Sequence, residues 1–201
     1  MYNVNKNIDS ESSATNFLDV GIHEDVELKG VEYKISPKEG NEFMVFHFEK
    51  DGKTLSHTEW KPKDVDPEKL ENKTNNQIKR VKHIVTKFIS EDSYVFVATD
   101  FKSFCTNTIK LLGNAYVGKK VRIKVVYSFN NFTSLPNYVP FIEKMEIPKT
   151  SSKLEILSID KMTKEKADVE PAVQENPFVK EENPLTEGDA IPVVNEDELP
   201  F

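Results

Sequence analysis

The chain has 201 residues, 37% of them hydrophobic and 10% aromatic, and 34 acidic against 27 basic residues give a net charge of -7. This composition excludes a fully disordered chain, and no apolar run reaches the roughly 18 residues that span a bilayer. The first residues lack a signal-peptide pattern, and the single cysteine cannot form an internal disulfide. We therefore expect a soluble protein of the cytoplasm.

The charge is distributed unevenly along the chain. Residues 163–201 hold eleven acidic residues and three lysines, a net charge of -8, so residues 1–162 carry +1 of the total of -7. Lysines outnumber arginines 25 to 2 in the whole chain, which favours loose contacts with phosphates over bidentate reading of bases. We predict a flexible N-terminal arm (1–16), a folded domain (17–162) and a disordered acidic tail (163–201).

The first part of the folded domain has the pattern of three successive strands. Between residues 22 and 35 the apolar residues change parity at Gly30, which indicates a β-bulge in a long, bent strand that can serve two sheets. Residues 41–50 and 53–61 alternate in polarity and are joined by Asp51-Gly52, a strong hairpin signal. These features predict a three-stranded meander.

The next segment changes to a helical period. Apolar residues spaced three and four apart predict a helix from Pro67 to Phe88, capped by Asp66, which residues 72–77 could interrupt. A second helix should begin after Asp100 and end at Gly113. Residues 94–97, between the helices, fit either a short strand or a buried connector.

The last part of the domain returns to strands. Residues 120–129 alternate clearly, and a polar loop (130–137) leads to a last strand (138–147), with residues 154–159 as a further candidate edge strand. Three strands, a helical insert and two strands predict a mainly β fold. In particular, they predict a five-stranded OB-fold barrel with helices between strands three and four. The competing interpretation is an unrelated small α+β sheet.

The C-terminal tip combines acidic and apolar residues in a way that suits a docking peptide. Apolar side chains can enter a pocket, proline limits the entropy lost on binding, and the acids can meet basic residues. The tip consists of Glu196, Asp197, Glu198, Leu199, Pro200 and Phe201. It resembles the C-terminal tip of bacterial and phage single-stranded-DNA-binding proteins. A disordered acidic tail that ends in an aromatic residue by chance is the alternative.

Two further stretches, residues 17–24 and 135–143, resemble phage-encoded single-strand binders of the OB type. The resemblance implies that the body binds single-stranded DNA without sequence preference. It also implies that the tip recruits replication and repair proteins and competes with DNA for the groove. The long helical insert (67–113) departs from that family, so the outline of the groove and the oligomeric state are not carried over.

Single-strand binders combine a basic groove with aromatic faces on which bases stack. Residues of these types on the predicted strands and loops form our candidate DNA-binding set: Tyr33, Lys34, Phe43, His47, Trp60, Lys61, Arg122, Lys124, Phe132 and Tyr138. Each has a structural alternative, because Phe43 and Trp60 could belong to the core and the charged residues to ordinary surface. We assign the basic face of the first helix (Lys79, Arg80, Lys82, Lys87) to solvated surface.

No pattern in the sequence supports catalysis or a cofactor. His47, His57 and Glu59 lie on neighbouring predicted strands without metal-ligand spacing, and Cys105 lies on the apolar stripe of a helix. We therefore expect a non-enzymatic protein that binds single-stranded DNA in replication, recombination or repair. The alternatives are a protein-interaction adaptor with an OB-like domain and a nuclease. A nuclease would need a metal cluster that the sequence does not show.

An acid-x-Pro-apolar pattern occurs three times in the tail. The copies are residues 175–178, 182–185 and 198–201. They are either a coincidence of composition or, as a hypothesis, two weaker docking motifs ahead of the tip.

Overall fold

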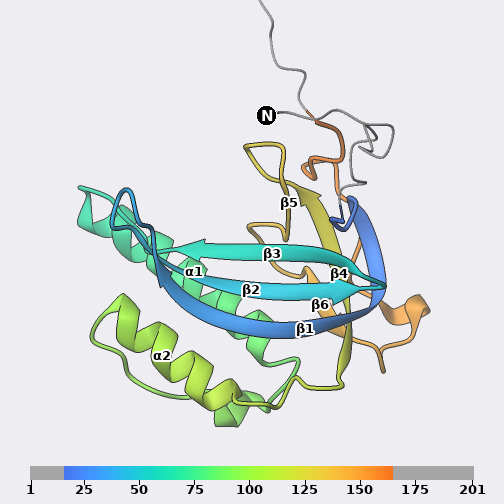
Figure 1. Ribbon diagram of the computed structural model, residues 1–201, viewed down its shortest axis with the longest axis horizontal. Helices are drawn as coiled ribbons and strands as arrows, with labels where there is room; N and C mark the ends of the chain where they lie inside the picture. The colour runs from blue at the N-terminus through green and yellow to red at the C-terminus, as the bar shows by residue number, and fades with distance from the viewer. Residues whose placement is uncertain (1–15, 165–201) are drawn as a thin grey trace, which may run out of the picture. The chain divides into compact units, whose positions relative to one another are not determined.

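The computed structural model describes residues 16–164, which form an antiparallel β-sheet and two α-helices (Figure 1). Residues 1–15 and 165–201, and with them the docking tip, lie outside the described residues. The strands and α-helices in chain order are β1 (Gly21–Ile35), β2 (Glu42–Lys50), β3 (Lys53–Trp60), α1 (Pro67–Val85), α2 (Phe101–Leu112), β4 (Lys120–Tyr127), β5 (Thr133–Ser134) and β6 (Ile142–Lys144). Two short 3-10 helices, Glu91–Ser93 and Lys149–Ser151, lie in the connections.

The six strands form one sheet in the order β3-β2-β1-β4-β5, with β6 also paired to β4. The predicted meander and the helices between the third and fourth strands are confirmed. The count of five strands is wrong, and within residues 16–164 no ladder joins β3 to β5, so the sheet is open. The two edge strands nevertheless approach each other, because His57 Nδ1 on β3 lies 3.1 Å from Ser134 Oγ on β5.

Strand β1 is long enough to pair with two different strands. Its first half pairs with β4 and its second half with β2, and the register shifts between Leu28 and Gly30. This shift confirms the bulge predicted at Gly30. A second irregularity, between His23 and Val26 in the pairing with β4, was not predicted, and Asp25 has a positive φ of 57° there.

The two helices begin at the predicted caps. Asp66 accepts hydrogen bonds from the backbone N–H groups of Glu68 and Lys69, and Asp100 forms a capping box with Ser103. The interruption that residues 72–77 could have caused does not occur, and α1 continues through them to Val85. Gln77, at the end of this stretch, is buried and hydrogen-bonded to β3, and such tertiary contacts offset the modest helix propensity of the Asn and Thr residues before it.

One hydrophobic core joins the sheet to both helices. It includes Phe46 and Phe48 of β2, Ile84 of α1, Cys105 of α2 and Ile123 of β4. Burial raises the pKa of the Cys105 thiol to about 12, which agrees with the structural role expected from its place on the apolar stripe. The core therefore lies between the inner face of the sheet and the helical insert.

The C-terminal part of the domain departs most from the predicted elements. The predicted polar loop (130–137) contains β5, the predicted last strand (138–147) is reduced to β6, and residues 154–159 form no strand. Instead, residues 143–160 run across the side of β4 that carries Arg122 and Lys124 and contact both side chains. This side of β4 is therefore covered by the chain itself.

Candidate nucleic-acid interface

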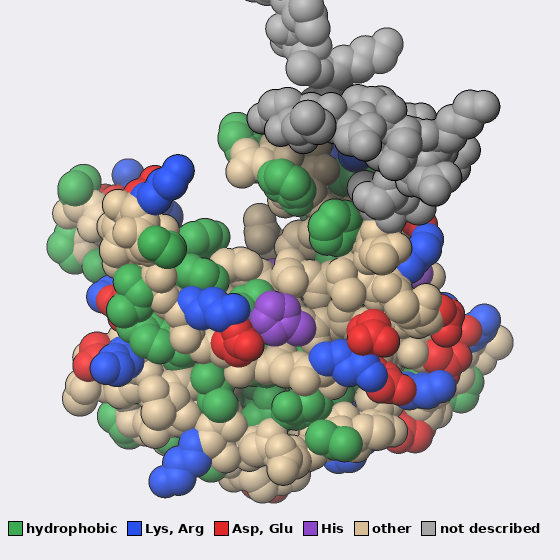
Figure 2. Space-filling view, in the orientation of Figure 1, with side chains coloured by type: hydrophobic (Ala, Val, Ile, Leu, Met, Phe, Trp, Pro, Cys, Tyr) green, Lys and Arg blue, Asp and Glu red, His purple; other side chains and the backbone are tan. Residues whose placement is uncertain are grey.

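The outer side of β1, β2 and β3 forms the open face of the sheet, which we call the three-strand face. Its rows follow from the strand register. Lys34 of β1, Phe43 of β2 and Trp60 of β3 lie side by side, and the next rows are Glu32, Val45 and Thr58, then Gly30, His47 and Ser56. In the space-filling view this side shows a histidine among lysine and acidic side chains over β2, below a notch in the surface (Figure 2).

An aromatic pair stands at one end of this face. The ring centroids of Phe43 and Trp60 are 4.6 Å apart, with 43° between the ring planes. The Trp60 residue is 51% exposed, whereas Phe43 is half-buried beneath it. From the sequence, Trp60 could be either a core residue or a stacking platform, and the structure places its side chain on the surface. Its exposed ring offers a flat apolar surface of the kind on which a base can stack.

The lysines around the aromatic pair each have a polar partner. Lys34 pairs with Glu32, and Lys61 pairs with Glu42, with side-chain exposures that leave both lysines open to solvent. Hydrogen bonds from Lys61 and Tyr33 lower the pKa of Glu42, so this carboxylate is ionised at neutral pH. Exposed pairs of this kind contribute little free energy, so a phosphate can replace the carboxylate.

His47 lies in the middle of the three-strand face. Its Nδ1 is 3.2 Å from Ser56 Oγ, and its Nε2 is 3.7 Å from Glu32 Oε2. The ring is half-buried between neighbouring strands. His47 therefore lies on the same face as Lys34, Phe43 and Trp60. Lys61 follows the last residue of β3 and pairs with Glu42 at the edge of this face.

Tyr33 does not belong to this face, contrary to our prediction. Alternation places its side chain on the opposite side of β1 from Lys34, where its ring lies 6.5 Å from that of Phe101 in α2. The hydroxyl donates to Glu42 Oε2 at 2.7 Å, and this bond raises the pKa of Tyr33 to about 12. Tyr33 thus holds Glu42, the partner of Lys61, in place and has no open ring face toward the lysines.

The loop between β4 and β5 presents two further aromatic side chains. Phe132, which we predicted for the interface, is 72% exposed, and Phe129 is also exposed. Strand β4 ends at Tyr127, so Phe129 is not on the inner stripe of the strand as its alternation suggested. The polar Asn130-Asn131 pair that follows was a signal that the strand stops earlier. Both rings are available to a ligand that reaches this loop.

Arg122 is removed from the candidate set because it is buried. It is 4% exposed, and its guanidinium donates to Glu24 Oε1 at 2.9 Å and to Glu143. The pKa of Glu143 is lowered: burial alone would raise it, but hydrogen bonds from Ser152 and Arg122 outweigh that effect. Arg122 therefore has a structural role on β4.

Lys124 and Tyr138 form a second buried cluster on the same side of β4. Lys124 is 1% exposed, and its Nζ lies 2.8 Å from Tyr138 Oη and 2.9 Å from Asp160 Oδ2. The Tyr138 hydroxyl also donates to Asp160, and Lys124 Nζ covers the tyrosine ring at 4.7 Å from its centroid. Burial removes Lys124 from the candidate set, as it does Arg122. Tyr138 is partly buried, and its hydroxyl and one side of its ring are engaged by Asp160 and Lys124, so the structure gives it a packing role.

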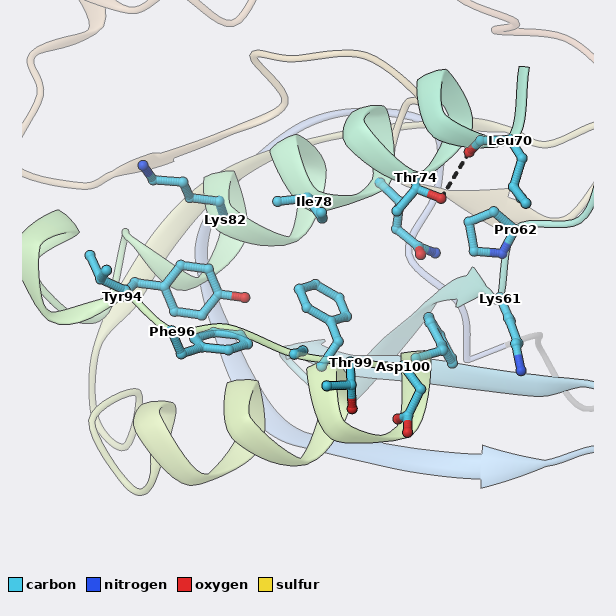
Figure 3. Close-up of a pocket in the computed structure, with 15 residues that line it drawn as sticks. Lys61, Pro62, Leu70, Thr74, Ile78, Lys82, Tyr94, Phe96, Thr99 and Asp100 are labelled. Carbon is cyan, nitrogen blue, oxygen red and sulfur yellow. Dashed lines mark hydrogen bonds between the residues drawn. The ribbon is translucent and has the colours of Figure 1, made fainter. Parts of the chain in front are cut away.

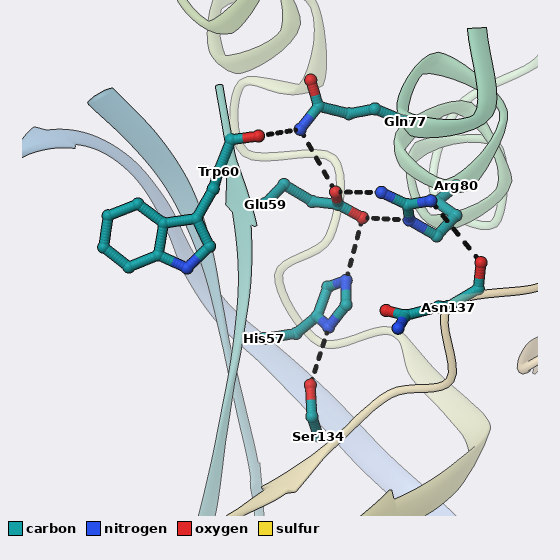
Figure 4. A network of polar contacts seen from close by, with 7 residues as sticks. All are labelled: His57, Glu59, Trp60, Gln77, Arg80, Ser134 and Asn137. Atoms are coloured by element: carbon teal, nitrogen blue, oxygen red, sulfur yellow. Dashed lines mark hydrogen bonds and ion pairs between the residues drawn. The ribbon is translucent and has the colours of Figure 1, made fainter. Parts of the chain in front are cut away.

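A buried polar network fixes β3 against α1 and β5 (Figure 4). Glu59 accepts two hydrogen bonds of 2.7 Å from Arg80, one from Gln77 and one from the Nε2–H of His57. Burial alone would raise the pKa of Glu59, but its bonds to Arg80 and His57 lower it to about 2. Gln77 also donates to the backbone carbonyl of Trp60 at 2.7 Å, so the network holds the platform residue in position.

This network corrects two expectations. Arg80, which we assigned to solvated surface, is mostly buried on Glu59, with 18% of its side chain exposed. His57 and Glu59, which we considered as weak metal ligands, are both members of this hydrogen-bonded network. Within residues 16–164 no group of three or more His, Cys, Asp or Glu side chains is arranged to hold a metal ion.

A scan against models of known protein families finds no match, and a search of curated protein sequences finds no similar protein. Among the described residues, neither helix is long and apolar enough to cross a membrane.

Proposed function

We propose that this protein binds single-stranded DNA without sequence preference on its three-strand face. The observation that carries the proposal is the aromatic pair of half-buried Phe43 and half-exposed Trp60, with Lys34 in the same row and Lys61 next to Trp60 in the chain. Proteins that hold single strands combine stacking platforms with lysine contacts to the phosphate backbone, and each stacked base contributes about 1–3 kcal/mol. This proposed function is binding alone and requires no catalysis by the residues that the structure describes.

The arrangement of the sheet supports an OB-type fold. In such folds the second and third strands, together with the loops that follow the first and fourth strands, contact the ligand. Here the aromatic pair lies on β2 and β3, and exposed Phe132 lies in the loop after β4. The network around Glu59 occupies the opening between β3 and β5, where an OB barrel would close. The helical insert lies on the other side of the core from this face.

The charge of the face predicts a strong dependence on salt. A phosphate has to displace the glutamate that pairs with each lysine, and affinity should fall with a slope near -0.7 per neutralised phosphate in a plot of log K against log salt. The acidic residues 163–201, with a net charge of -8, would compete for the same lysines at the high local concentration that a tether provides.

We assign two roles to the tail within this function. Its tip, residues 196–201, would recruit replication, recombination or repair proteins, and its charge would shield the face until DNA displaces it. Shielding should weaken in ordinary salt, because the Debye length there is about 8–10 Å.

The test is a titration of the full chain with oligo(dT), monitored through the fluorescence of Trp60. Trp60 is the only tryptophan, so quenching reports directly from the proposed site. Anisotropy of labelled single- and double-stranded DNA measures the preference. We expect tight single-strand binding that rises further in the variant E196Q/D197N/E198Q at low salt. Equal, weak binding of both DNA forms by both proteins would reject the proposal.

A protein-interaction adaptor is the second candidate. The observation that favours it is the presence of Glu32 on the three-strand face and of Glu42 at its edge, which pair with Lys34 and Lys61 and balance their charges. An adaptor would show no quenching with oligo(dT) and no single-strand preference, and the same titration therefore decides between the two candidates.

A further inference from the structure

A pocket of about 710 Å³ opens between α1, the connector 94–100 and α2 (Figure 3). Its wall is formed by aromatic and aliphatic side chains, among them Ile78 of α1, Tyr94 and Phe96 of the connector, and Phe104 of α2. Pockets of about 300–1,000 Å³ can bury a ligand of several side-chain groups. The pocket belongs to the helical insert and is separate from the aromatic pair on β2 and β3.

The entrance of this pocket exposes apolar surface to water. Val95, which lines it, is 77% exposed, and Ile78 is 39% exposed. The connector is extended without pairing to any strand of the sheet, so its valines point into solvent while Tyr94 is buried. Exposed apolar groups around a concave site are typical of surfaces that bind another chain.

Two lysines, Lys61 and Lys82, stand at opposite ends of the pocket (Figure 3). Each forms an exposed ion pair, with Glu42 and Glu91 respectively, and 44% and 42% of the two lysine side chains remain exposed. Exposed pairs exchange partners at little cost. The pocket therefore suits a peptide with an apolar segment between or beside negative charges.

We propose that this pocket binds the tip of the chain's own tail, residues 198–201, with the Phe201 ring inside it. The tip has this chemistry, because acidic residues 196–198 are followed directly by Leu199, Pro200 and Phe201. Residues 165–201 make 37 residues, and a random-coil chain of that length has a mean end-to-end distance of about 30–36 Å, and much more when extended. The tether also gives the tip a millimolar effective concentration at sites within its reach.

The position of Lys61 couples this pocket to the three-strand face. Lys61 lines the pocket and directly follows Trp60 of the aromatic pair. A tip bound in the pocket would bring its acids to a lysine that DNA also needs. This coupling, although not the docking itself, rests on the proposed DNA-binding function.

The test measures binding of a fluorescently labelled peptide of residues 193–201 to full-length protein at micromolar concentration. We expect the F201A variant, whose own tip is impaired, to bind the peptide about tenfold more tightly than the unaltered chain. The matched control is F178A, which removes the phenylalanine of the similar segment 175–178. It should bind the peptide as weakly as the unaltered chain.

A pair of valine variants locates the site. In the F201A background, V95E should lower peptide affinity at least about tenfold, because it places a like charge against the acidic tip. V97E makes the same change two residues away, at an exposed valine that does not line the pocket, and should have less than about a twofold effect. I78E, on the opposite wall, should repeat the effect of V95E.

Several results would overturn the docking proposal. These are equal peptide binding by V95E, I78E and V97E, equal binding by F201A and the unaltered chain, or an F178A effect that matches F201A. If tips instead bind between copies, the unaltered chain should self-associate, and F201A should bind the peptide no more tightly than the unaltered chain. That result would also reject docking within one chain. DNA titrations of the same variants separate the two proposals. Peptide binding without DNA binding leaves docking intact, and DNA binding with no peptide binding rejects docking alone.

Discussion

The two polar sides of the sheet, that of β1–β3 and that of β4, show the same alternation in sequence but opposite environments. On the three-strand face Lys34 is exposed and Trp60 is half-exposed. On β4 the equivalent charged residues, Arg122 and Lys124, are 4% and 1% exposed and fully paired. Alternation in sequence therefore identifies the two sides of a strand but does not show which side remains exposed to solvent.

The cause of the difference is the chain that follows β4. Glu143 and Asp160 supply the carboxylates that pair with Arg122 and Lys124, and Ser152 donates a hydrogen bond to Glu143. Nothing comparable in residues 16–164 crosses the three-strand face, where the charged pairs lie within the face itself. One basic side of the sheet therefore stabilises the fold, and the other remains available to a ligand.

The largest expected effect is loss of stability on the covered side. R122A should lower the free energy of unfolding by about 3–5 kcal/mol, because it leaves Glu143 buried without its cation. Urea denaturation measures this change. The control K34A, on the open face, should change stability by less than about 1 kcal/mol. A stable R122A protein that lost affinity for DNA would reverse our assignment of the two sides.

The next effect concerns binding on the open face. W60A should weaken single-stranded DNA binding by about 1–3 kcal/mol, since a stacked base loses its platform. Anisotropy of labelled DNA measures this variant, which lacks the fluorescent residue. Stability should change little, because the ring is half-exposed. If affinity were unchanged while stability fell, Trp60 would be a packing residue and the platform would lie elsewhere.

A third prediction concerns acid. Asp160 has a lowered pKa in the folded protein: burial opposes this, but bonds from Tyr138 and Lys124 outweigh it. The unfolded chain therefore binds more protons in acid, and the stability from this group is complete above the ordinary value of 3.8 and is lost as pH falls through the lower folded value. The variant D160N should make unfolding in acid less steep, and circular dichroism measures this transition. E32Q, on the open face, should change it far less.

The smallest effect should come from releasing Lys61, at the edge of the open face, from its ion pair. E42Q keeps an oxygen for the Tyr33 hydroxyl but removes the charge that pairs with Lys61. We expect single-strand affinity to rise by about 0.2–1 kcal/mol, the usual range for an exposed ion pair. The gain should disappear at high salt. A loss of affinity at low salt would show that Glu42 itself supports binding.

The sequence by itself determined the elements whose signals are local. The bulge at Gly30, the Asp51-Gly52 hairpin and the caps at Asp66 and Asp100 depend on a few neighbouring residues, and the structure confirms each. Alternation also put Phe43 and His47 on one side of the second strand, as the register shows, but it left open whether that side belongs to the core.

Only the tertiary structure decided which polar groups face water. Arg122 and Lys124 are buried because residues 21 and 36 positions later in the chain supply carboxylates to them, and no local pattern reports such a pairing. The same holds for Arg80, which crosses from α1 to Glu59 on β3, and for the pocket between the helices. Burial of a charge depends on distant partners, whereas strands, turns and caps depend on neighbours in sequence.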